Sequence, residues 1–419
     1  MSYTVLSPWA RRKIEGTKPL NKRIENLNGK TVGLLSLFKE YDPYFMRIVG
    51  KELFKAYPLA CFTEYVYKVD QMDIEEDYVN YQSFKEWVDS VDIVVGMGAD
   101  AGSCSIYAGY IFAVCEKLGK PTVMWVCDVY SSAANCGLAA KGYSNLRKVY
   151  YETGFGTVPP GVDIETYTEQ VYGDEIRALM QECIAAMTAP LTAEEINPVQ
   201  LTDYADASIA GEYDELNRLF YKNGWTNGTP IVPPTEEAVA EMCRGTDLPR
   251  DYVVACLPPM MGEATVEKIA VNAVMAGCHP VHMPIIIAIV RALSDPKLLK
   301  PFTSCPTPFP MLNLECQTCS TAAFAPLFVI SGPITKSLGM YFNKNYLSPY
   351  DVTKSSIPRA YSYIILNIAG VRTKTEDMSF MGHESRFGVC IAENTEESPW
   401  PGLAFDFGYD KDDSCVVVN

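Results

Sequence analysis

The sequence has no apolar run long enough for a membrane span. Its most apolar stretches, such as PIIIAIVRAL at 284–293, fall far short of the roughly 20 residues that a membrane-spanning helix needs. The opening stretch MSYTVLSPWARRKIEG lacks the apolar segment of a signal peptide. We therefore expect a cytoplasmic protein with no membrane partner.

Basic charge is also scarce. The chain has 35 Lys and Arg against 51 Asp and Glu, which gives a formal net charge of −16 at pH 7, and it has no run of five or more basic residues. A nucleic-acid backbone would be repelled by this charge. We therefore expect a small-molecule substrate and no nucleic-acid partner.

The common nucleotide-binding fingerprints are missing. The first predicted strand is not followed by G-x-G-x-x-G, and neither G-x-x-x-x-G-K-[ST] nor the G-x-S-x-G nucleophile elbow occurs. We therefore expect no cofactor. Histidine is rare as well, with three residues in 419, so few candidates exist for a histidine acid or base.

Strand-like and helix-like segments alternate through the first half of the chain. The predicted strands are short, almost continuously apolar segments, at 31–38, 60–69, 92–98 and 121–129, and helical periodicity follows each of them. This pattern is typical of a parallel sheet with helices on both faces. Residues 31–190 are thus predicted to form a doubly wound, flavodoxin-like α/β domain, with its fourth strand followed by a helix through 133–151.

The second half has a different pattern. Residues 1–30 are predicted to be an arm or irregular lead-in, 191–208 a linker, and 209–419 an α+β or irregular α/β domain. Its predicted helices start after an N-cap at Thr235, span 262–278 up to a stop at Gly277, and start again at Pro284. Its predicted strands are 325–333 and 388–394.

The stretch GMGADAGSCSIYAG (96–109) places Cys104 where a strand passes into a helix. In an open parallel sheet, ligands bind outside the carboxyl ends of the strands. The first turn of a helix lowers the pKa of a thiol and favours the nucleophilic thiolate. The backbone around Gly102, Ser103 and Ser105 could also hold an anion or substrate oxygen. The competing interpretation is a small cysteine packed beneath the turn.

Two stretches of the first half, LLSLFKEYDPYFMRIVGKEL and GMGADAGSCS, resemble the UGSC family of thiol and selenocysteine proteins. The second half resembles the domain often associated with that family, most specifically in TVEKIAVNAVMAGC and IAENTEESPW. The resemblance implies the α/β fold and a reactive sulfur or selenium. The first signature position is Ala101 here, so Cys104 is the only thiol in the motif, which favours addition and elimination over dithiol reduction.

A thiol enzyme usually needs a group that moves a proton. His383, in the Gly-flanked loop SFMGHESRFG, is the preferred histidine, although a structural role is the common alternative for this residue and for His279. Glu263 and Glu267 are predicted to share one face of a helix, and each could shuttle a proton; a solvated Glu–Lys face is the alternative.

Further polar residues are candidates for binding substrate. Asn272 lies on the same predicted helix, and Glu393 and Asn394 end a predicted strand. Arg386 is close to His383 and could bind a carboxylate with two hydrogen bonds, as could Arg359 and Arg372; an ordinary surface arginine is the alternative for each.

The 14 cysteines are expected to be reduced, and most of them buried. Cys316 and Cys319 form a C-x-x-C pair with Cys305 nearby, but a structural zinc site normally has two such pairs, so we expect no metal.

Three hypotheses about function follow. The first is an enzyme, of lyase, cyclase or transferase type, in which Cys104 forms a covalent adduct with a small electrophile. The second is a thiol/disulfide oxidoreductase that pairs Cys104 with Cys136, Cys316 or Cys319. The third is a binding protein without catalysis. A homodimer is expected from the aromatic loops.

Overall fold

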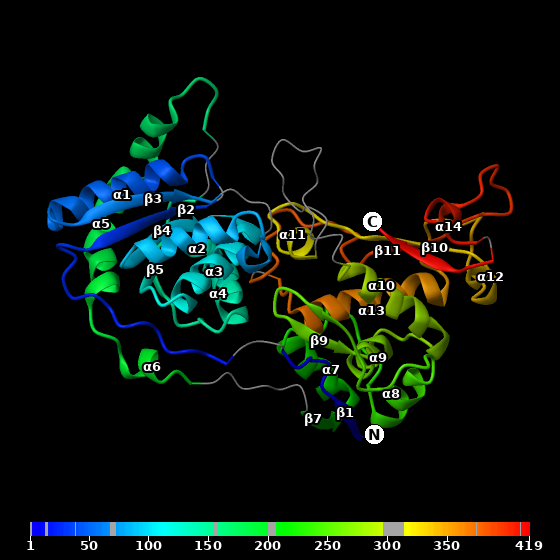
Figure 1. Ribbon diagram of the computed structural model, residues 1–419. Helices are drawn as coiled ribbons and strands as arrows, with labels where there is room; N and C mark the ends of the chain where they lie inside the picture. Colours follow the sequence, from blue (N-terminus) through cyan, green and yellow to red (C-terminus); the bar gives the residue numbers. More distant parts are fainter. Residues whose placement is uncertain are drawn as a thin grey trace.

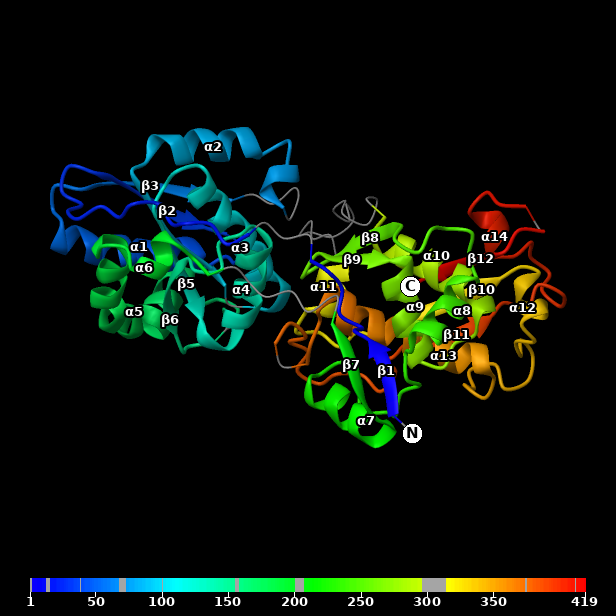
Figure 2. The same cartoon turned by 90° about the horizontal axis from the view of Figure 1, so that it is seen from below.

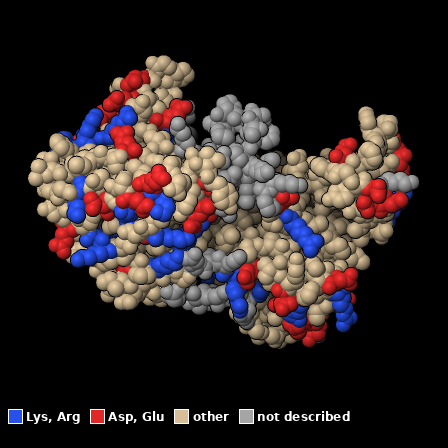
Figure 3. Space-filling model, viewed as in Figure 1, with Lys and Arg blue, Asp and Glu red and all other residues tan. Residues whose placement is uncertain are grey.

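The protein is described by a computed structural model that covers residues 2–12, 16–37, 39–67, 73–99, 101–154, 158–199, 207–295, 314–373, 375–410 and 412–419. The chain forms two lobes (Figures 1 and 2). The N-terminal lobe comprises residues 18–199, and the C-terminal lobe comprises residues 2–12 together with residues from 207 onward. Figure 3 shows acidic and basic side chains interspersed over the N-terminal lobe.

The N-terminal lobe contains a parallel five-stranded sheet with the order β3-β2-β4-β5-β6. If the five strands of this sheet are numbered 1 to 5 along the chain, their order is 2-1-3-4-5, which is that of flavodoxin-like folds. The predicted doubly wound domain is thus confirmed. The strands are β2 (Thr31–Ser36), β3 (Cys61–Val66), β4 (Ile93–Ala99), β5 (Thr122–Cys127) and β6 (Arg147–Tyr151).

Helices cover both faces of this sheet. One face packs against α1 (Asp42–Ala56) and α5 (Ile164–Thr188), and the other against α2 (Tyr81–Ser90), α3 (Gly102–Lys117) and α4 (Ser131–Ala140). The central strands β2, β4 and β5 are mostly apolar, as expected for strands buried on both faces, and β5 has no exposed residue. The edge strands β3 and β6 are more polar and partly exposed. A short helix, α6 (Ala193–Ile196), follows α5 inside the predicted linker.

The helix predicted through 133–151 is wrong in its second part. The helix α4 ends at Ala140, Gly142 has a φ of 82°, and residues 147–151 form β6, which pairs with β5. Glycine adopts this left-handed conformation without steric cost, so it ends the helix. Val149 and Tyr151 are buried while Tyr150 is exposed, an alternation typical of a strand.

The C-terminal lobe is α+β and has three small sheets. The sheet β11-β10-β12 confirms the strands predicted at 325–333 and 388–394, which are β10 (Leu327–Ser331) and β11 (Val389–Ala392); the third strand is β12 (Cys415–Val418). The other two sheets are the pairs β1 (Ser2–Leu6) with β7 (Ser208–Glu212), and β8 (Val253–Leu257) with β9 (Gly262–Thr265).

The helices of this lobe surround α9 in one apolar cluster. The Thr235 cap is confirmed, since its side chain accepts a hydrogen bond from the Ala238 N–H. The helices are α7 (Tyr213–Lys222), α8 (Glu236–Cys243), α9 (Val266–Met275), α10 (Met283–Leu293), α11 (Leu314–Thr318), α12 (Ile334–Ser337), α13 (Val352–Ile364), which continues as a π-helical turn at Ile365–Ala369, and α14 (Leu403–Asp406).

The segment 1–30, predicted to be an arm or irregular lead-in, contains a strand. The strand β1 pairs antiparallel with β7, and Val5 is buried in the core of the C-terminal lobe. Residues 20–27 instead pack on the N-terminal lobe, where Leu20 and Leu27 are buried. Because the segment is mostly polar, its few buried apolar residues do not form a recognisable pattern in the sequence.

Candidate functional site

Cys104 lies where the strand order of the sheet reverses. The central strands β2 and β4 are neighbours, and the chain continues from each toward opposite edges of the sheet. A crevice at this point, outside the carboxyl ends of the strands, is the usual ligand site of doubly wound folds. Cys104 is the third residue of α3, which follows β4, and only 8% of its surface is exposed.

The N-cap residue of α3 has no side chain that could cap the helix. The N-cap residue, Ala101, has an extended backbone and no oxygen to offer, while the Ser105 N–H and hydroxyl both donate to its carbonyl, at 3.0 and 3.1 Å. Ser103 and Ser105 are buried. The N-cap residue thus offers no anionic side chain to the positive end of the helix dipole, where a thiolate in the first turn would be stabilised.

A backbone segment of the C-terminal lobe covers this turn. A Cβ added to Gly102 would lie 2.7 Å from the Cys319 carbonyl oxygen and 3.0 Å from the Thr321 nitrogen. Gly102 thus serves the close approach of two backbones rather than only a tight turn. Residues 319–321, called the covering segment below, close the Cys104 turn from the side of the other lobe.

Arg386 fixes the covering segment. Its Nη2 donates to the Thr318 carbonyl at 2.9 Å and to Asp377 Oδ2 at 2.7 Å. Nη1 reaches the Phe324 carbonyl at 3.4 Å, and the guanidinium lies 5.5 Å from the centre of the Phe324 ring. This arginine, expected to bind substrate, thus holds both ends of the segment that covers α3.

The two lobes share an apolar junction beside Cys104. Ile106, Tyr107 and Tyr110 of α3 belong to the same buried cluster as the core of the C-terminal lobe. On α4, Cys136 Sγ lies 3.1 Å from Met260 Sδ. The Met260 N–H donates at 3.0 Å to the carbonyl of Ala369, in the π-helical turn.

His383 lies on the surface, in the loop that follows Phe380, whose N–H donates to the Thr321 carbonyl of the covering segment at 3.2 Å. Its side chain is exposed, and Nδ1 accepts a hydrogen bond from the Ser385 N–H at 3.0 Å. Within the described part of the chain, it makes no hydrogen bond to Cys104. The ring caps its own loop, and the structure does not bring this candidate together with the thiol.

The prediction that Glu263 and Glu267 share a helix face is wrong. Thr265 caps α9 through the Lys268 N–H, so the helix starts at Val266 and Glu263 belongs to β9. Glu267 forms an ion pair with Arg250, which also binds Glu236. Glu263 is half-buried, and its carboxylate has no ion-pair or hydrogen-bond partner among the described residues.

Asn272 is part of the scaffold. It is fully buried on α9, and its Nδ2 donates to the Pro8 carbonyl at 3.1 Å and to the Lys268 carbonyl at 2.9 Å, while its Oδ1 accepts from Asn367 Nδ2 at 2.8 Å. Its side chain thus links α9 to Pro8 and to the π-helical turn.

Glu393 and Asn394 stabilise the loop after β11. Glu393 accepts hydrogen bonds from the Ser331 hydroxyl and from the Leu403 N–H, the latter at 2.9 Å, and so fixes the start of α14. Asn394 exchanges hydrogen bonds with Glu397 at 3.0 and 3.2 Å. These contacts place both residues around β11, and none links them to the Cys104 turn.

His282 is a buried structural histidine. Its Nδ1 accepts a hydrogen bond from the His279 N–H at 3.1 Å, and its Nε2 lies 3.2 Å from Thr353 Oγ1. Burial lowers the pKa of His282 from 6.5 to about 4. The folded protein therefore holds this ring neutral.

The lowered pKa of His282 predicts that the folded state loses stability in acid. The folded pKa is depressed, so the stabilisation is fully present above pH 6.5 and is lost as the pH falls from 6.5 to about 4, by up to about 3 kcal/mol. Urea unfolding of wild type and His282→Gln across this range measures it. We expect a flatter pH dependence for His282→Gln, whereas the exposed control His383→Gln should follow wild type. Parallel curves for His282→Gln and wild type would contradict the assignment.

The cysteine-rich segment gives no sign of a metal site. Among the described residues, no cluster of three or more His, Cys, Asp or Glu side chains has metal-binding geometry. Cys305 and the Cys316 side chain lie outside the described residues. Cys319 is fully buried, with its Sγ 3.6 Å from the Thr318 hydroxyl.

One contact of the junction was missed in the sequence. The contact of Cys136 with Met260 joins residues far apart in the chain, and no local pattern marks either of them. Arg372 lies in the field of Cys136, and a hydrogen bond to the buried Glu376 raises the pKa of its guanidinium. The glycine-rich composition around Gly102 was a signal for close backbone approach, but it did not identify the covering segment.

No helix in the described ranges has the length and apolar character needed to cross a membrane.

Comparisons with known proteins support the resemblance in the first half of the chain. No curated protein and no solved structure matches the sequence. A family model does match, that of the UGSC family, over residues 4–188. These residues span β1 and the N-terminal lobe up to the end of α5, including the Cys104 turn. Residues 4–188 are thus similar to the UGSC family.

Proposed function

We propose that the protein is a thiol-dependent enzyme in which Cys104 attacks a small electrophilic molecule. The observation that carries this proposal is the position of Cys104, in the uncapped first turn of α3, at the switch point of the sheet and beneath the covering segment. A thiolate there has the helix dipole beside it, and Cys104 is largely shielded from bulk solvent.

The reaction is an addition followed by an elimination. The Cys104 sulfur forms a bond to an electrophilic carbon, and the leaving group departs with the bonding electron pair. A second nucleophile, either water or another group of the substrate, then displaces the sulfur and restores the thiolate. Transferase and cyclase reactions fit this scheme. In a lyase reaction the sulfur would instead leave by elimination, as the adduct loses a proton and forms a double bond.

A carboxylate is the preferred group for moving the proton. Glu263 is half-buried, has no partner among the described residues, and follows Gly262, which packs against the Ile368 carbonyl of the π-helical turn. Glu267 is bound to Arg250, and His383 caps its own loop. Of the three candidates from the sequence, Glu263 thus keeps its side chain available for proton transfer.

The pH dependence of Cys104 alkylation tests whether the thiol is ionised at neutral pH. The rate of alkylation by iodoacetamide is measured by mass spectrometry of the digested protein. We expect the rate to level off below about pH 7, well under the usual thiol pKa of about 8.5. Two cysteines serve as internal references: Cys61 is exposed, and Cys115 is fully buried, with a pKa raised by burial. The Cys104→Ser variant confirms which peptide carries the label.

A Cys104 rate that rises only above pH 8, in parallel with Cys61, would contradict a standing thiolate. The hypothesis of a binding protein without catalysis would then be favoured, and Cys104→Ser should bind ligand as well as wild type does. A plateau makes trapping of the substrate adduct on Cys104 the next experiment, with Glu263→Gln expected to slow adduct formation and the exposed Glu237→Gln as its control.

The contact between the lobes favours thiol/disulfide exchange as a second candidate. The backbone of Cys319 touches Gly102, two residues before Cys104, and Cys136 lies on the neighbouring helix α4. Mild oxidation followed by digestion without reductant distinguishes the candidates. A Cys104–Cys319 or Cys104–Cys136 peptide pair supports the exchange reaction, whereas Cys104 recovered as a free thiol supports the single-nucleophile enzyme.

A homodimer remains a prediction. Trp400, Phe405 and Phe407, in or beside α14 at the far end of the C-terminal lobe (Figure 1), are all exposed. Such exposure supports self-association.

A further inference from the structure

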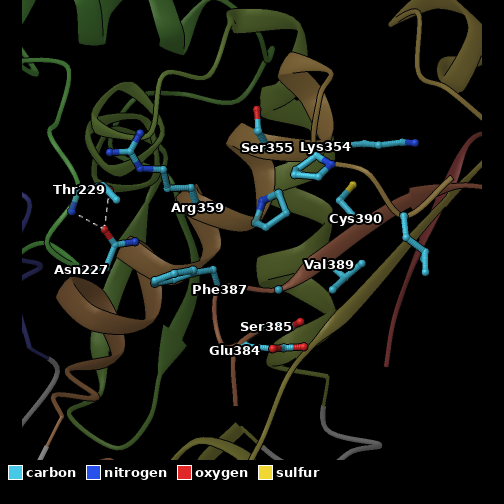
Figure 4. Close-up of a pocket in the computed structure, with 14 residues that line it drawn as sticks. Asn227, Thr229, Lys354, Ser355, Arg359, Glu384, Ser385, Phe387, Val389 and Cys390 are labelled. Carbon is cyan, nitrogen blue, oxygen red and sulfur yellow. Dashed lines mark hydrogen bonds between the residues drawn. The ribbon is translucent and has the colours of Figure 1, made fainter. Parts of the chain in front are cut away.

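The C-terminal lobe contains a cavity of about 380 Å³ between α13, the loop before β11 and the loop that precedes α8. Figure 4 shows Asn227, Thr229 and Arg359 on one side of it and Lys354, Val389 and Cys390 on the other. This volume suits a small ligand. No residue between 31 and 190 lines the cavity, so it is distinct from the Cys104 turn.

Arg359 is held in place but not neutralised. Its Nε and Nη2 donate to the Tyr363 hydroxyl at 3.2 and 3.1 Å, and Nη2 also donates to the Pro230 carbonyl. No acidic side chain in the described part of the chain forms an ion pair with it, and Nη1 has no acceptor there. In a chain with a net charge of −16, a fixed and uncompensated guanidinium in a cavity suits an anion.

Asn227 adds a second donor on the same side. Its Oδ1 is occupied, since it accepts from the Thr229 N–H at 3.2 Å, from the Thr229 hydroxyl at 2.7 Å and from Tyr363 at 3.3 Å. These contacts fix the orientation of the amide. The Nδ2 group has no acceptor among the described residues, so it joins Arg359 Nη1 as a free donor.

The other residues that line the cavity are poorly suited to bind an anion. Pro358, Phe387 and Val389 form apolar walls, and burial raises the pKa of Cys390 to about 12, so its thiol stays neutral. Lys354 is buried, and its Nζ is occupied by the Tyr346 carbonyl at 3.0 Å, with Asp351 at 3.9 Å. Glu384 lies away from Arg359 (Figure 4) and would repel negative charge.

We propose that this cavity binds a small organic carboxylate, with its carboxylate group on Arg359 and Asn227 and its apolar body against Phe387 and Val389. Arg359 and Asn227 supply the polar donors, and Phe387 and Val389 supply the apolar surface, a combination by which ligand sites fix orientation. This second site does not depend on the reaction at Cys104.

Fluorine NMR of the full-length protein with para-fluorobenzoate and para-fluorobenzamide tests the proposal, because these probes differ in charge but hardly in shape. We expect the benzoate signal to broaden and shift at millimolar concentration. The benzamide and the Arg359→Gln variant should each show at least about tenfold weaker binding, the loss typical of a charge-assisted hydrogen-bonded pair.

A second variant keeps the proposal testable if Arg359→Gln fails to fold. Ser355 lines the cavity, and its hydroxyl bonds only to carbonyls of its own helix region, at 3.0 and 3.2 Å. Ser355→Phe therefore fills the cavity while leaving Arg359 intact, and it should abolish binding; the exposed Arg218→Gln should bind as wild type does. Equal binding of benzoate and benzamide, or unchanged binding in both cavity variants, would overturn the proposal.

Discussion

The Gly102→Ala variant is expected to loosen the covering segment and expose Cys104. The new Cβ would meet the Cys319 oxygen at 2.7 Å and the Thr321 nitrogen at 3.0 Å, and both are backbone atoms that cannot turn aside. Overpacking of this kind costs about 1–3 kcal/mol. If the segment yields, each 1.4 kcal/mol raises the open population tenfold, so Cys104 should be alkylated about tenfold faster or more.

A second glycine provides the matched control. Gly173 lies in α5, and a Cβ there would meet the ends of the Glu169 and Arg177 side chains, which can move. Gly173→Ala should therefore be neutral or stabilising, by up to about 1 kcal/mol, because alanine favours the helix. An unchanged ratio of Cys104 to Cys61 alkylation in Gly102→Ala would show that the covering segment does not control access to the thiol.

The Glu116→Leu variant is expected to lose about 3–5 kcal/mol of unfolding free energy, because it leaves the Arg23 guanidinium buried without its counter-charge. Arg23 Nη1 lies 2.7 Å from Glu116 Oε1, and both side chains are buried. Glu116 also accepts hydrogen bonds from the Thr122 N–H at 2.9 Å and from the Asn21 amide groups at 2.9 and 2.7 Å. Urea unfolding at neutral pH measures the loss.

The double variant Arg23→Leu/Glu116→Leu separates charge from packing. Because it removes the buried charge along with its partner, it should be more stable than Glu116→Leu alone. The exposed pair of Lys85 and Asp89, at 2.5 Å on α2, is the surface reference; Asp89→Ala should hardly move the unfolding midpoint, as is usual for exposed pairs. A double variant less stable than Glu116→Leu would mean that packing, not charge, dominates at this position.

The sheet of the N-terminal lobe was predictable because its strands are apolar on both faces and alternate with amphipathic helices. The strand β6 was missed since RKVYY has one buried edge and two basic residues, which resemble the last turn of a helix. Likewise, β9 was assigned to the helix that follows it, because GEAT carries no apolar pattern and only the Thr265 cap separates the two elements.

The candidate site was predictable only in its first turn. The glycines and Cys104 mark a strand-to-helix turn, and parallel-sheet topology places that turn at a site. Arg386, Asn272 and Glu393 were chosen by residue type, but the structure commits each of them to internal hydrogen bonds. Their partners, the Thr318 carbonyl, the Pro8 carbonyl and the Leu403 N–H, are backbone groups far away in the sequence or unmarked by any motif.

The pairing of β1 with β7 makes the N-terminal lobe an insertion in the C-terminal lobe. The chain begins in one lobe, crosses to the other between residues 12 and 18, and returns between 199 and 207. A single proteolytic cut therefore leaves the lobes tethered, and two cuts are needed to release the inserted lobe. Trimming the first residues would remove a strand from the lobe that lies farther along the chain, and the UGSC match itself starts within that borrowed strand.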